Sequence, residues 1–250
     1  MNRIRIFDAP VDCVDMNSCL AQVEQMVASE RPNTIIAINP EKVIKAQQEL
    51  RLMSWLNNAK LVIPDGIGVV IAARLLFGAK LNRVPGSELM PKICELAARK
   101  GYRIFLYGAS KLTVEKAVEQ LRSTYVDIEI VGYQDGYLAD KDMPILIDRL
   151  NVLKPQILFV ALGSPRQELW MDQYLASVPS VRVCQGVGGT FDVIAGTVRR
   201  APQFFIRIYC EWLYRLLAQP KRILRQRALP LFAIKVINQW FFNCFSRKGG

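Results

Sequence analysis

One stretch of the chain, residues 157–192, most constrains the fold, because it contains two strand–glycine–helix units in succession. The first unit is the apolar run 157–162 followed by Gly163-Ser-Pro-Arg-Gln-Glu168 and a helical segment. The second is the apolar run 181–184, which ends at Gln185-Gly-Val-Gly-Gly-Thr-Phe-Asp192. Buried strands that lead through glycine into helices predict a parallel sheet. Ligands bind outside the carboxyl ends of such strands, where glycine permits close approach and helix N-termini favour anions.

The alternation of strand and helix extends from residue 34 to about residue 195, which predicts an α/β fold with a Rossmann-like parallel sheet and helices on both faces. An N-terminal β-hairpin is expected from residues 3–7 and 11–14, with its turn at Asp8-Ala-Pro10. The other expected strands are 34–38, 61–63, 103–107, 128–131, 157–162 and 181–184. The expected helices are 15–29, 41–57, a buried helix over 69–77, then 88–100, 111–125, 143–153 and a helix from Ser164-Pro165 through Leu175.

Positive charge is concentrated at the C-terminal end of the chain. From residue 199 onward there are eleven Lys and Arg and one acid, whereas the first 198 residues carry 22 basic and 21 acidic residues. This asymmetry favours a polyanionic partner, either nucleic acid or an anionic membrane. Aromatic and aliphatic residues at helical spacing in 204–217 and 228–245 are typical of helices that lie in the headgroup interface. We therefore expect a body over residues 1–200 and a basic, amphipathic helical appendage over residues 201–250.

The sequence contains no histidine, which excludes Ser-His-Asp and Cys-His nucleophiles, HExxH zinc sites and imidazole bases. Acid–base chemistry must fall to a carboxylate, Lys, Tyr or Cys.

The six cysteines form no CxxC pair and most lie in apolar runs, so we expect buried free thiols in a reducing compartment. No apolar run reaches the ~18 residues that would predict a spanning helix, and the first residues form no apolar signal region, so no export is expected.

Two polar residues stand at predicted strand ends and face the expected cleft. Asp65, before Gly66 and Gly68, is either a catalytic carboxylate or the cap of the next helix. Asn39, before Pro40, is either a ligand-binding amide or a helix cap.

Three further motifs admit both a chemical and a structural reading. Gln167 either holds a ligand through its amide or, with Glu168, belongs to a well-formed helix start. The Gly186–Gly189 run lacks the third glycine of GxGxxG, and no GxxxxGK[ST] motif occurs, which disfavours a P-loop ATPase. Asp140-Lys-Asp142 has the DxD form of some metal-bound sugar-nucleotide sites, but acids are common where a helix opens, and we expect no metal site there.

Seven ordered motifs resemble the WecG/TagA/CpsF family of bacterial glycosyltransferases, over essentially the whole chain. They are Pro64-Asp-Gly66, Phe105-Leu-Tyr-Gly-Ala109, Gly132-Tyr-Gln-Asp-Gly-Tyr137, Leu162-Gly-Ser-Pro-Arg-Gln-Glu168, Gly186-Val-Gly-Gly-Thr-Phe-Asp192, Arg200-Ala-Pro202, and Glu211-Trp-Leu-Tyr-Arg-Leu216 with Pro220-Lys-Arg222 and Arg225.

The resemblance implies an inverting, metal-independent enzyme without cofactor. Its donor would be UDP-N-acetylmannosamine or the corresponding uronic acid, and its acceptor an undecaprenyl-diphosphate-linked N-acetylglucosamine in cell-surface polysaccharide synthesis. It also implies a peripheral protein on the cytoplasmic face of the plasma membrane, bound to an anionic membrane surface and not to nucleic acid, with homo-oligomers left open. The tail is more similar to the WecG-like branch, whose donor is the uronic acid.

The resemblance also implies roles for particular residues. The base is Asp65, and Asn39, Arg83 and Gln167 bind substrate. The remaining expected substrate contacts lie in the shared motifs, at Gly108, Tyr137, Gly186, Gly188, Gly189 and Asp192. The tail residues Arg215, Arg222 and Arg225 either neutralise a diphosphate or only attract lipid headgroups. One departure is Ala37, where the Gram-positive branch carries Thr, so a hydroxyl is absent from the pocket.

Three alternatives to this function follow from the same features. The first is transfer of another hexose in capsule or exopolysaccharide assembly on the same fold. The second is a nucleic-acid-binding protein that uses the basic tail, although the tail charges alternate with Phe, Trp, Leu and Ile. The third is a nicotinamide-dependent dehydrogenase on a similar sheet, which the missing third glycine disfavours.

Overall fold

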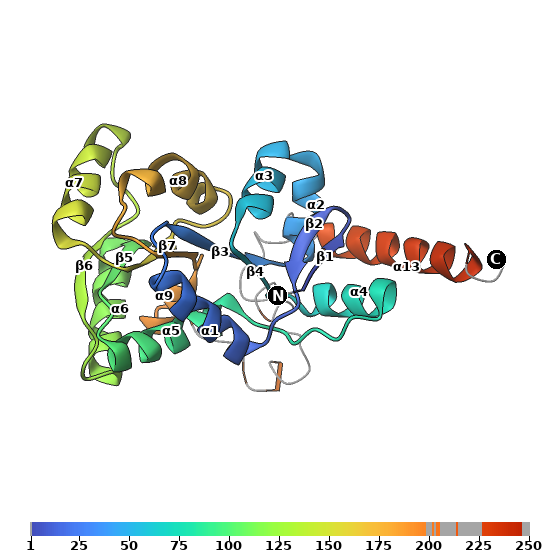
Figure 1. Ribbon diagram of the computed structural model, residues 1–250, viewed down its shortest axis with the longest axis horizontal. Helices are drawn as coiled ribbons and strands as arrows, with labels where there is room; N and C mark the ends of the chain where they lie inside the picture. The colour runs from blue at the N-terminus through green and yellow to red at the C-terminus, as the bar shows by residue number, and fades with distance from the viewer. Residues whose placement is uncertain (1, 199–201, 203, 206–213, 215–226, 247–250) are drawn as a thin grey trace.

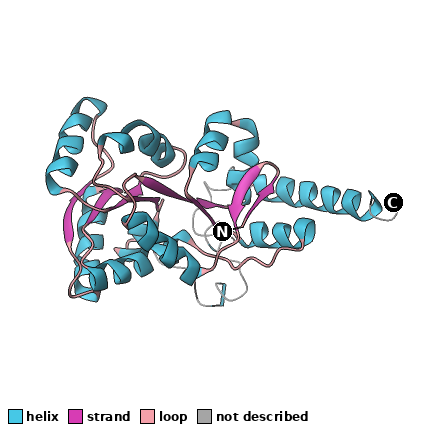
Figure 2. Cartoon of the chain, viewed as in Figure 1, coloured by secondary structure: helices cyan, strands magenta, loops and turns pink. Residues whose placement is uncertain are grey.

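The computed structural model describes residues 2–198, 202, 204, 205, 214 and 227–246 of the 250-residue chain. Its centre is a six-stranded sheet in the order β4-β3-β8-β7-β5-β6, in which every neighbouring pair is parallel (Figure 2). A separate two-stranded antiparallel hairpin, β1-β2, stands at the N-terminus. The predicted Rossmann-like parallel sheet and N-terminal hairpin are therefore confirmed.

The elements keep the labels of Figure 1. The strands are β1 (Arg3–Ile6), β2 (Ala9–Asp12), β3 (Asn33–Ile38), β4 (Leu61–Pro64), β5 (Ile104–Gly108), β6 (Ile130–Gln134), β7 (Ile157–Ala161) and β8 (Val183–Gly186). The α-helices are α1 (Met16–Val27), α2 (Pro40–Gln48), α3 (Leu50–Asn58), α4 (Ile67–Phe77), α5 (Gly86–Lys100), α6 (Lys111–Thr124), α7 (Met143–Leu153), α8 (Arg166–Tyr174), α9 (Thr190–Ile194) and α13 (Ala228–Ser246). The short 3-10 turns η1 (Asp140–Asp142) and η2 (Leu175–Ser177) flank α7 and α8.

Two hydrophobic cores cover the two faces of the sheet, as helices on both faces require. Neighbouring residues of one strand point to opposite faces, so Ile36 joins one core and Ile35 the other. The first core contains side chains from the hairpin, α2, α3, α4, α7, α8 and α13. The second contains side chains from α1, α5, α6 and α9. Strands β4, β5, β7 and β8 are buried along their whole length, as their apolar sequences predict.

Several predicted boundaries are wrong, each for a local reason. The hairpin turns at Phe7 and Asp8, both with positive φ, so β2 begins at Ala9. The helix predicted over 41–57 is two helices, because Glu49 adopts extended backbone between α2 and α3. Strands β6 and β8 begin and end about two residues later than predicted. In β6 this shift includes Gly132, where a Cβ would lie 2.7 Å from the Phe105 ring.

The prediction that 69–77 forms a fully buried helix is also wrong. One side of α4 packs in the core through Val69, Ala72 and Ala73, while Ile71 and Leu75 are 51% and 42% exposed. Apart from Arg74, the exposed side is also apolar, so the sequence shows little amphipathic pattern that would distinguish the two sides.

The last described helix, α13, lies beside α4 and extends away from the body of the molecule (Figure 1). Its inner side packs on the body: Phe232 and Val236 are buried, and the Phe232 ring meets the Phe7 ring edge-on with 5.8 Å between centroids. Lys235 Nζ donates to Gln47 Oε1 of α2 at 2.7 Å. Pro230 falls within the first turn of this helix, where proline is tolerated because the backbone N–H has no helical partner.

The described part of α13 confirms a C-terminal helical appendage with one packed and one exposed apolar side. The helix predicted over 204–217 falls almost entirely outside the described residues, as do the basic run from 221 and the arginines Arg215, Arg222 and Arg225. Of residues 2–198, 202, 204, 205, 214 and 227–246, none belongs to a helix long and apolar enough to cross a membrane. The described cysteines, Cys13, Cys19, Cys94, Cys184 and Cys244, are free thiols.

Candidate active site

A cleft of about 1130 Å³ lies at the carboxyl edge of the sheet. Its walls are the turns that follow β3, β4 and β8, the loop before α5, the start of α8 and the start of α13. The expected location of the ligand site, at the carboxyl ends of the strands, thus coincides with a large cleft.

Asp65 lies in this cleft, held at three atoms by its surroundings. Its backbone N–H donates to the Ile38 carbonyl at 3.0 Å, and its own carbonyl accepts from Arg83 Nε at 2.9 Å. Its carboxylate Oδ1 accepts a hydrogen bond of 3.0 Å from the backbone N–H of Gly86, the first residue of α5. The carboxylate is therefore fixed in position by neighbouring backbone before any substrate arrives.

The alternative that Asp65 caps the next helix is wrong. The N-cap residue of α4 is Gly66, and no side chain caps that helix. The Asp65 carboxylate instead accepts from the first turn of a different helix, α5. The carboxylate therefore supports the start of α5 and also lines the cleft, a position compatible with a role as base.

Asn39 is the helix cap that one of its two predicted readings describes, and it also lies in the cleft lining. As the N-cap of α2, it accepts at Oδ1 from the Lys42 backbone N–H at 2.8 Å. The turn of Asn39 and the turn of Asp65 pack directly against each other. A Cβ added to Gly66 would lie 2.8 Å from Pro40 Cδ and 3.1 Å from Asn39 Cβ, so glycine at 66 is what permits this contact.

Gln167 is buried at the opposite wall and uses both ends of its amide. Its Oε1 accepts from the Gly188 backbone N–H at 3.1 Å, and its Nε2 donates to Glu168 Oε1 at 3.2 Å. Its amide occupies the space above Gly186, where a Cβ would lie 2.5 Å from Nε2. Gly186, Gly188 and Gly189 all line the cleft, as expected. The helix start was predicted less well: α8 begins at Arg166 after a cis Ser164–Pro165 bond and has no side-chain cap.

Three expected substrate contacts lie outside the cleft lining. Gly108 ends β5, where a Cβ would lie 2.5 Å from the backbone of Ala161, so close strand packing accounts for this glycine. Tyr137 is 80% exposed, and Asp192 holds Thr197 through a 3.1 Å hydrogen bond to its carbonyl. Neither contributes to the described lining of the cleft.

The DxD sequence forms η1 ahead of α7 and is not part of the cleft lining. Across the described part of the chain, no group of three or more His, Cys, Asp or Glu residues is arranged to hold a metal ion.

Sequence reasoning missed a buried ion pair beside the cleft, between Lys42, which lines the cleft, and Glu168. Lys42 Nζ donates to Glu168 Oε1 at 2.7 Å, and both side chains are buried. Burial alone would raise the pKa of the Glu168 carboxyl, but the Lys42 ammonium and the Gln167 amide outweigh burial and hold this pKa below its ordinary value. A lysine in the first turn of α2, against the helix dipole, is the sequence signal that could have marked Lys42 as unusual, although it does not identify Glu168 as the partner.

The fold and the cleft together are those of an α/β protein with a candidate substrate site at the carboxyl edge of a Rossmann-like sheet. A model of the glycosyl transferase WecG/TagA/CpsF family matches residues 4–244. The chain belongs to this family and is a glycosyltransferase, which confirms the resemblance seen in its motifs. Family membership disfavours both the nucleic-acid-binding and the dehydrogenase alternatives.

Two similar proteins carry the same name, N-acetylglucosaminyldiphosphoundecaprenol N-acetyl-beta-D-mannosaminyltransferase. The chain is 38% identical to the protein of Bacillus spizizenii (strain ATCC 23059 / NRRL B-14472 / W23) over 203 residues, covering 81% of this chain and 78% of the relative. It is 33% identical to the protein of Bacillus subtilis (strain 168) over 235 residues, covering 94% of this chain and 91% of the relative.

Proposed function

We propose that this glycosyltransferase moves N-acetylmannosamine, or its uronic acid, from a UDP donor to undecaprenyl-diphosphate-linked N-acetylglucosamine. The names of the two Bacillus relatives support this acceptor and a mannosaminyl donor. The observation that carries the proposal is the Asp65 carboxylate, fixed by Gly86 within a cleft of about 1130 Å³ that can admit two sugar substrates.

The reaction is a single displacement that inverts the anomeric centre. Asp65 takes the proton of the acceptor hydroxyl as its oxygen attacks the anomeric carbon of the donor sugar. The bond between that carbon and the β-phosphate oxygen breaks, and UDP leaves with the electron pair. Asn39, Arg83 and Gln167 line the cleft and are proposed to orient the donor.

The leaving UDP develops negative charge that the site must stabilise. The charged residues in the described lining are balanced, with three bases (Lys42, Lys45, Arg83) and three acids (Glu41, Glu49, Asp65). Additional cations are therefore needed, and we assign this role to Arg215, Arg222 and Arg225, whose guanidinium groups suit diphosphates. In this mechanism the positive charge comes from the protein and not from a metal ion, so transfer should persist in EDTA.

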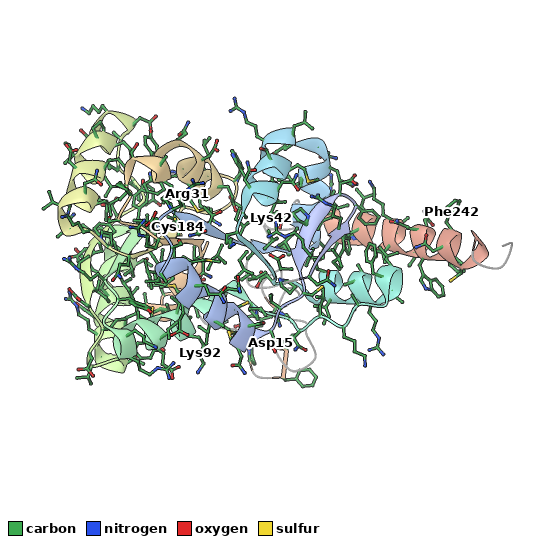
Figure 3. All side chains as sticks on the ribbon, in the orientation of Figure 1. Asp15, Arg31, Lys42, Lys92, Cys184 and Phe242 are labelled. Carbon is green, nitrogen blue, oxygen red and sulfur yellow. The ribbon has the colours of Figure 1, made fainter. Side chains whose placement is uncertain are left out.

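The acceptor is embedded in lipid, so the enzyme must work at a membrane surface, which we place at the cytoplasmic face. The exposed sides of α4 and α13 support such peripheral binding: they carry Ile71, Leu75, Phe77, Leu231, Ile234, Ile237, Trp240, Phe241 and Phe242, named here the apolar face. Phe242 lies on the part of α13 farthest from the body (Figure 3). Both helices begin at the cleft, so docking through the apolar face would bring the cleft to the lipid surface.

The same reasoning extends to the domain organisation. We propose that residues 1–200 form the catalytic body and that residues 201–250 form the membrane-associating appendage. The strong positive charge of the appendage adds roughly 1 kcal/mol per basic residue near an anionic leaflet.

A donor panel tests the proposed function. The full-length protein is mixed with a polyprenyl-diphosphate N-acetylglucosamine acceptor in liposomes and with UDP-linked N-acetylmannosamine, its uronic acid, N-acetylglucosamine or glucose. We expect transfer from one of the two mannosamine-type donors and much less from the other sugars. Transfer only from another hexose would replace the proposed donor, and the absence of any transfer to this acceptor would contradict the proposed function.

A further inference from the structure

The buried ion pair between Lys42 and Glu168 is placed where it contributes little to helix stability. Lys42 is the third residue of α2 and Glu168 the third residue of α8, and 2.7 Å separates their charged atoms. A cation in the first turn of a helix opposes the helix dipole. Burying two charges costs much of what their attraction returns, so such pairs are weak contributors to net stability.

The pair also leaves a polar atom unsatisfied. Glu168 Oε2 is buried, and the described residues offer it no hydrogen-bond partner. An unpaired buried acceptor is unfavourable, which again argues against selection for stability alone. Residues that break local rules in this way concentrate at functional sites. Figure 3 shows Lys42 in the middle of the molecule, and its side chain lines the cleft.

The hydrogen bonds of the pair continue across the floor of the cleft. Glu168 Oε1 accepts from both Lys42 Nζ and Gln167 Nε2, at 2.7 and 3.2 Å. Gln167 Oε1 then accepts from the Gly188 N–H at 3.1 Å. Since β8 lies between β3 and β7 in the sheet, this chain of contacts passes over the end of β8 and joins the turns after β3, β7 and β8.

We propose that Lys42 and Glu168 are positioning residues for the donor diphosphate. They hold the starts of α2 and α8 at a fixed separation and set the orientation of the Gln167 amide, so that the surrounding N–H groups point at the leaving group. The inference rests on the proposed function, because it assigns these residues to the donor side of that reaction. A displacement of about 1 Å in such a site lowers the rate by about 100-fold.

The test separates positioning from stability through a charge swap. Glu168→Gln and the double variant Lys42→Glu/Glu168→Lys are compared with the wild type for thermal midpoint, for affinity for UDP by calorimetry, and for kcat and KM of transfer. The swap restores an ion pair, but a lysine at 168 offers no acceptor to Gln167 Nε2. We therefore expect the swap to recover the thermal midpoint lost in Glu168→Gln, while transfer remains about 100-fold below wild type in both.

Two conservative variants keep the test decisive if the swap does not fold. Lys42→Arg preserves the pair and should retain most transfer. Glu168→Asp keeps the charge but withdraws it from Lys42, so the thermal midpoint should fall as in Glu168→Gln, and transfer assayed well below that midpoint should stay about 100-fold low. Transfer that follows the thermal midpoint across all variants, or a swap or Glu168→Asp variant with wild-type transfer, would overturn the positioning role. A wild-type protein without transfer would instead contradict the proposed function itself.

Discussion

The carboxylate of Asp65 is held by the first backbone N–H of a helix that begins 21 residues later, that of Gly86, at 3.0 Å. This contact ties the end of β4 to the start of α5. Through this contact a backbone donor of a rigid helix helps to orient the proposed base.

Replacing Gly86 with proline should therefore impair transfer without unfolding the protein. Proline is favoured at the first position of a helix, and Pro85 before it already has extended backbone. The substitution removes the N–H that Asp65 accepts, and a hydrogen bond to a charged group is worth about 1.5–3 kcal/mol, or about 10- to 100-fold in rate.

Gly86→Ala is the matched control, because it keeps the N–H and its Cβ would lie 3.6 Å from Ala37 Cβ, an ordinary contact. Initial rates and thermal midpoints of both variants are the measurements. Equal rates in the proline and alanine variants would show that the contact does not orient the base.

The Gly66→Ala variant should separate the turns of Asn39 and Asp65. The added Cβ would lie 2.8 Å from Pro40 Cδ, so the two turns must move apart, at a cost of about 1–3 kcal/mol in the free energy of unfolding. The rate of sugar transfer should fall together with the stability. Because the clash is with the proline ring, Pro40→Ala should restore part of both losses in the double variant. Urea denaturation and transfer assays provide the double-mutant cycle, and strictly additive effects would contradict the packing account.

Substitutions on the apolar face should weaken binding to membranes. Leu75→Ser combined with Ile234→Ser removes two exposed aliphatic side chains from adjacent helices, and burying each is worth up to ~1.5–3 kcal/mol. We expect at least about tenfold weaker binding to anionic liposomes in a flotation assay. Leu112→Ser, which removes a leucine that is 59% exposed on α6, is the control and should bind as the wild type does. Unchanged flotation of the double variant would exclude this face from the membrane contact.

The stability contribution of Glu168 should depend on pH in a defined direction. The Lys42 ammonium and Gln167 hold the pKa of the folded carboxyl below its ordinary value of 4.5, despite burial. A lowered pKa stabilises the folded state fully above about pH 4.5, and this contribution is lost as pH falls through the folded-state pKa. The difference in unfolding free energy between wild type and Glu168→Gln should therefore shrink below pH 4.5. A difference that grows on acidification would contradict the favourable pairing.

The fold was largely predictable because its signals are local and repeated. Apolar strands that end in glycine or in Asn-Pro and Pro-Asp turns mark the parallel sheet, and the carboxyl ends of those strands mark the cleft. Boundaries that depend on tertiary contacts were not predictable. The break at Glu49 has no glycine or proline to mark it, and Gly132 continues β6 by pairing with β5 at Phe105, a long-range contact.

The candidate site was predictable where polar residues or glycines follow the end of a strand. Asp65 and Gln167 stand at strand ends and are found in the cleft, whereas motif membership alone did not bring Gly108 or Tyr137 to it. The Lys42–Glu168 pair joins residues 126 apart in sequence, and no local pattern reveals such a partner. The exposure of one side of α4 was not predictable from the sequence, because that side is largely apolar like the buried side.

The most direct test of the account compares sugar transfer with donor binding in Asp65→Asn. The amide keeps the shape of the side chain and can still accept from Gly86, but it cannot take a proton from the acceptor hydroxyl. General-base catalysis contributes about 10²- to 10⁴-fold, so transfer should fall by at least about 100-fold while affinity for the UDP-sugar stays near that of the wild type. Transfer within a few-fold of the wild type would contradict the assignment of Asp65 as the base, and with it the central claim.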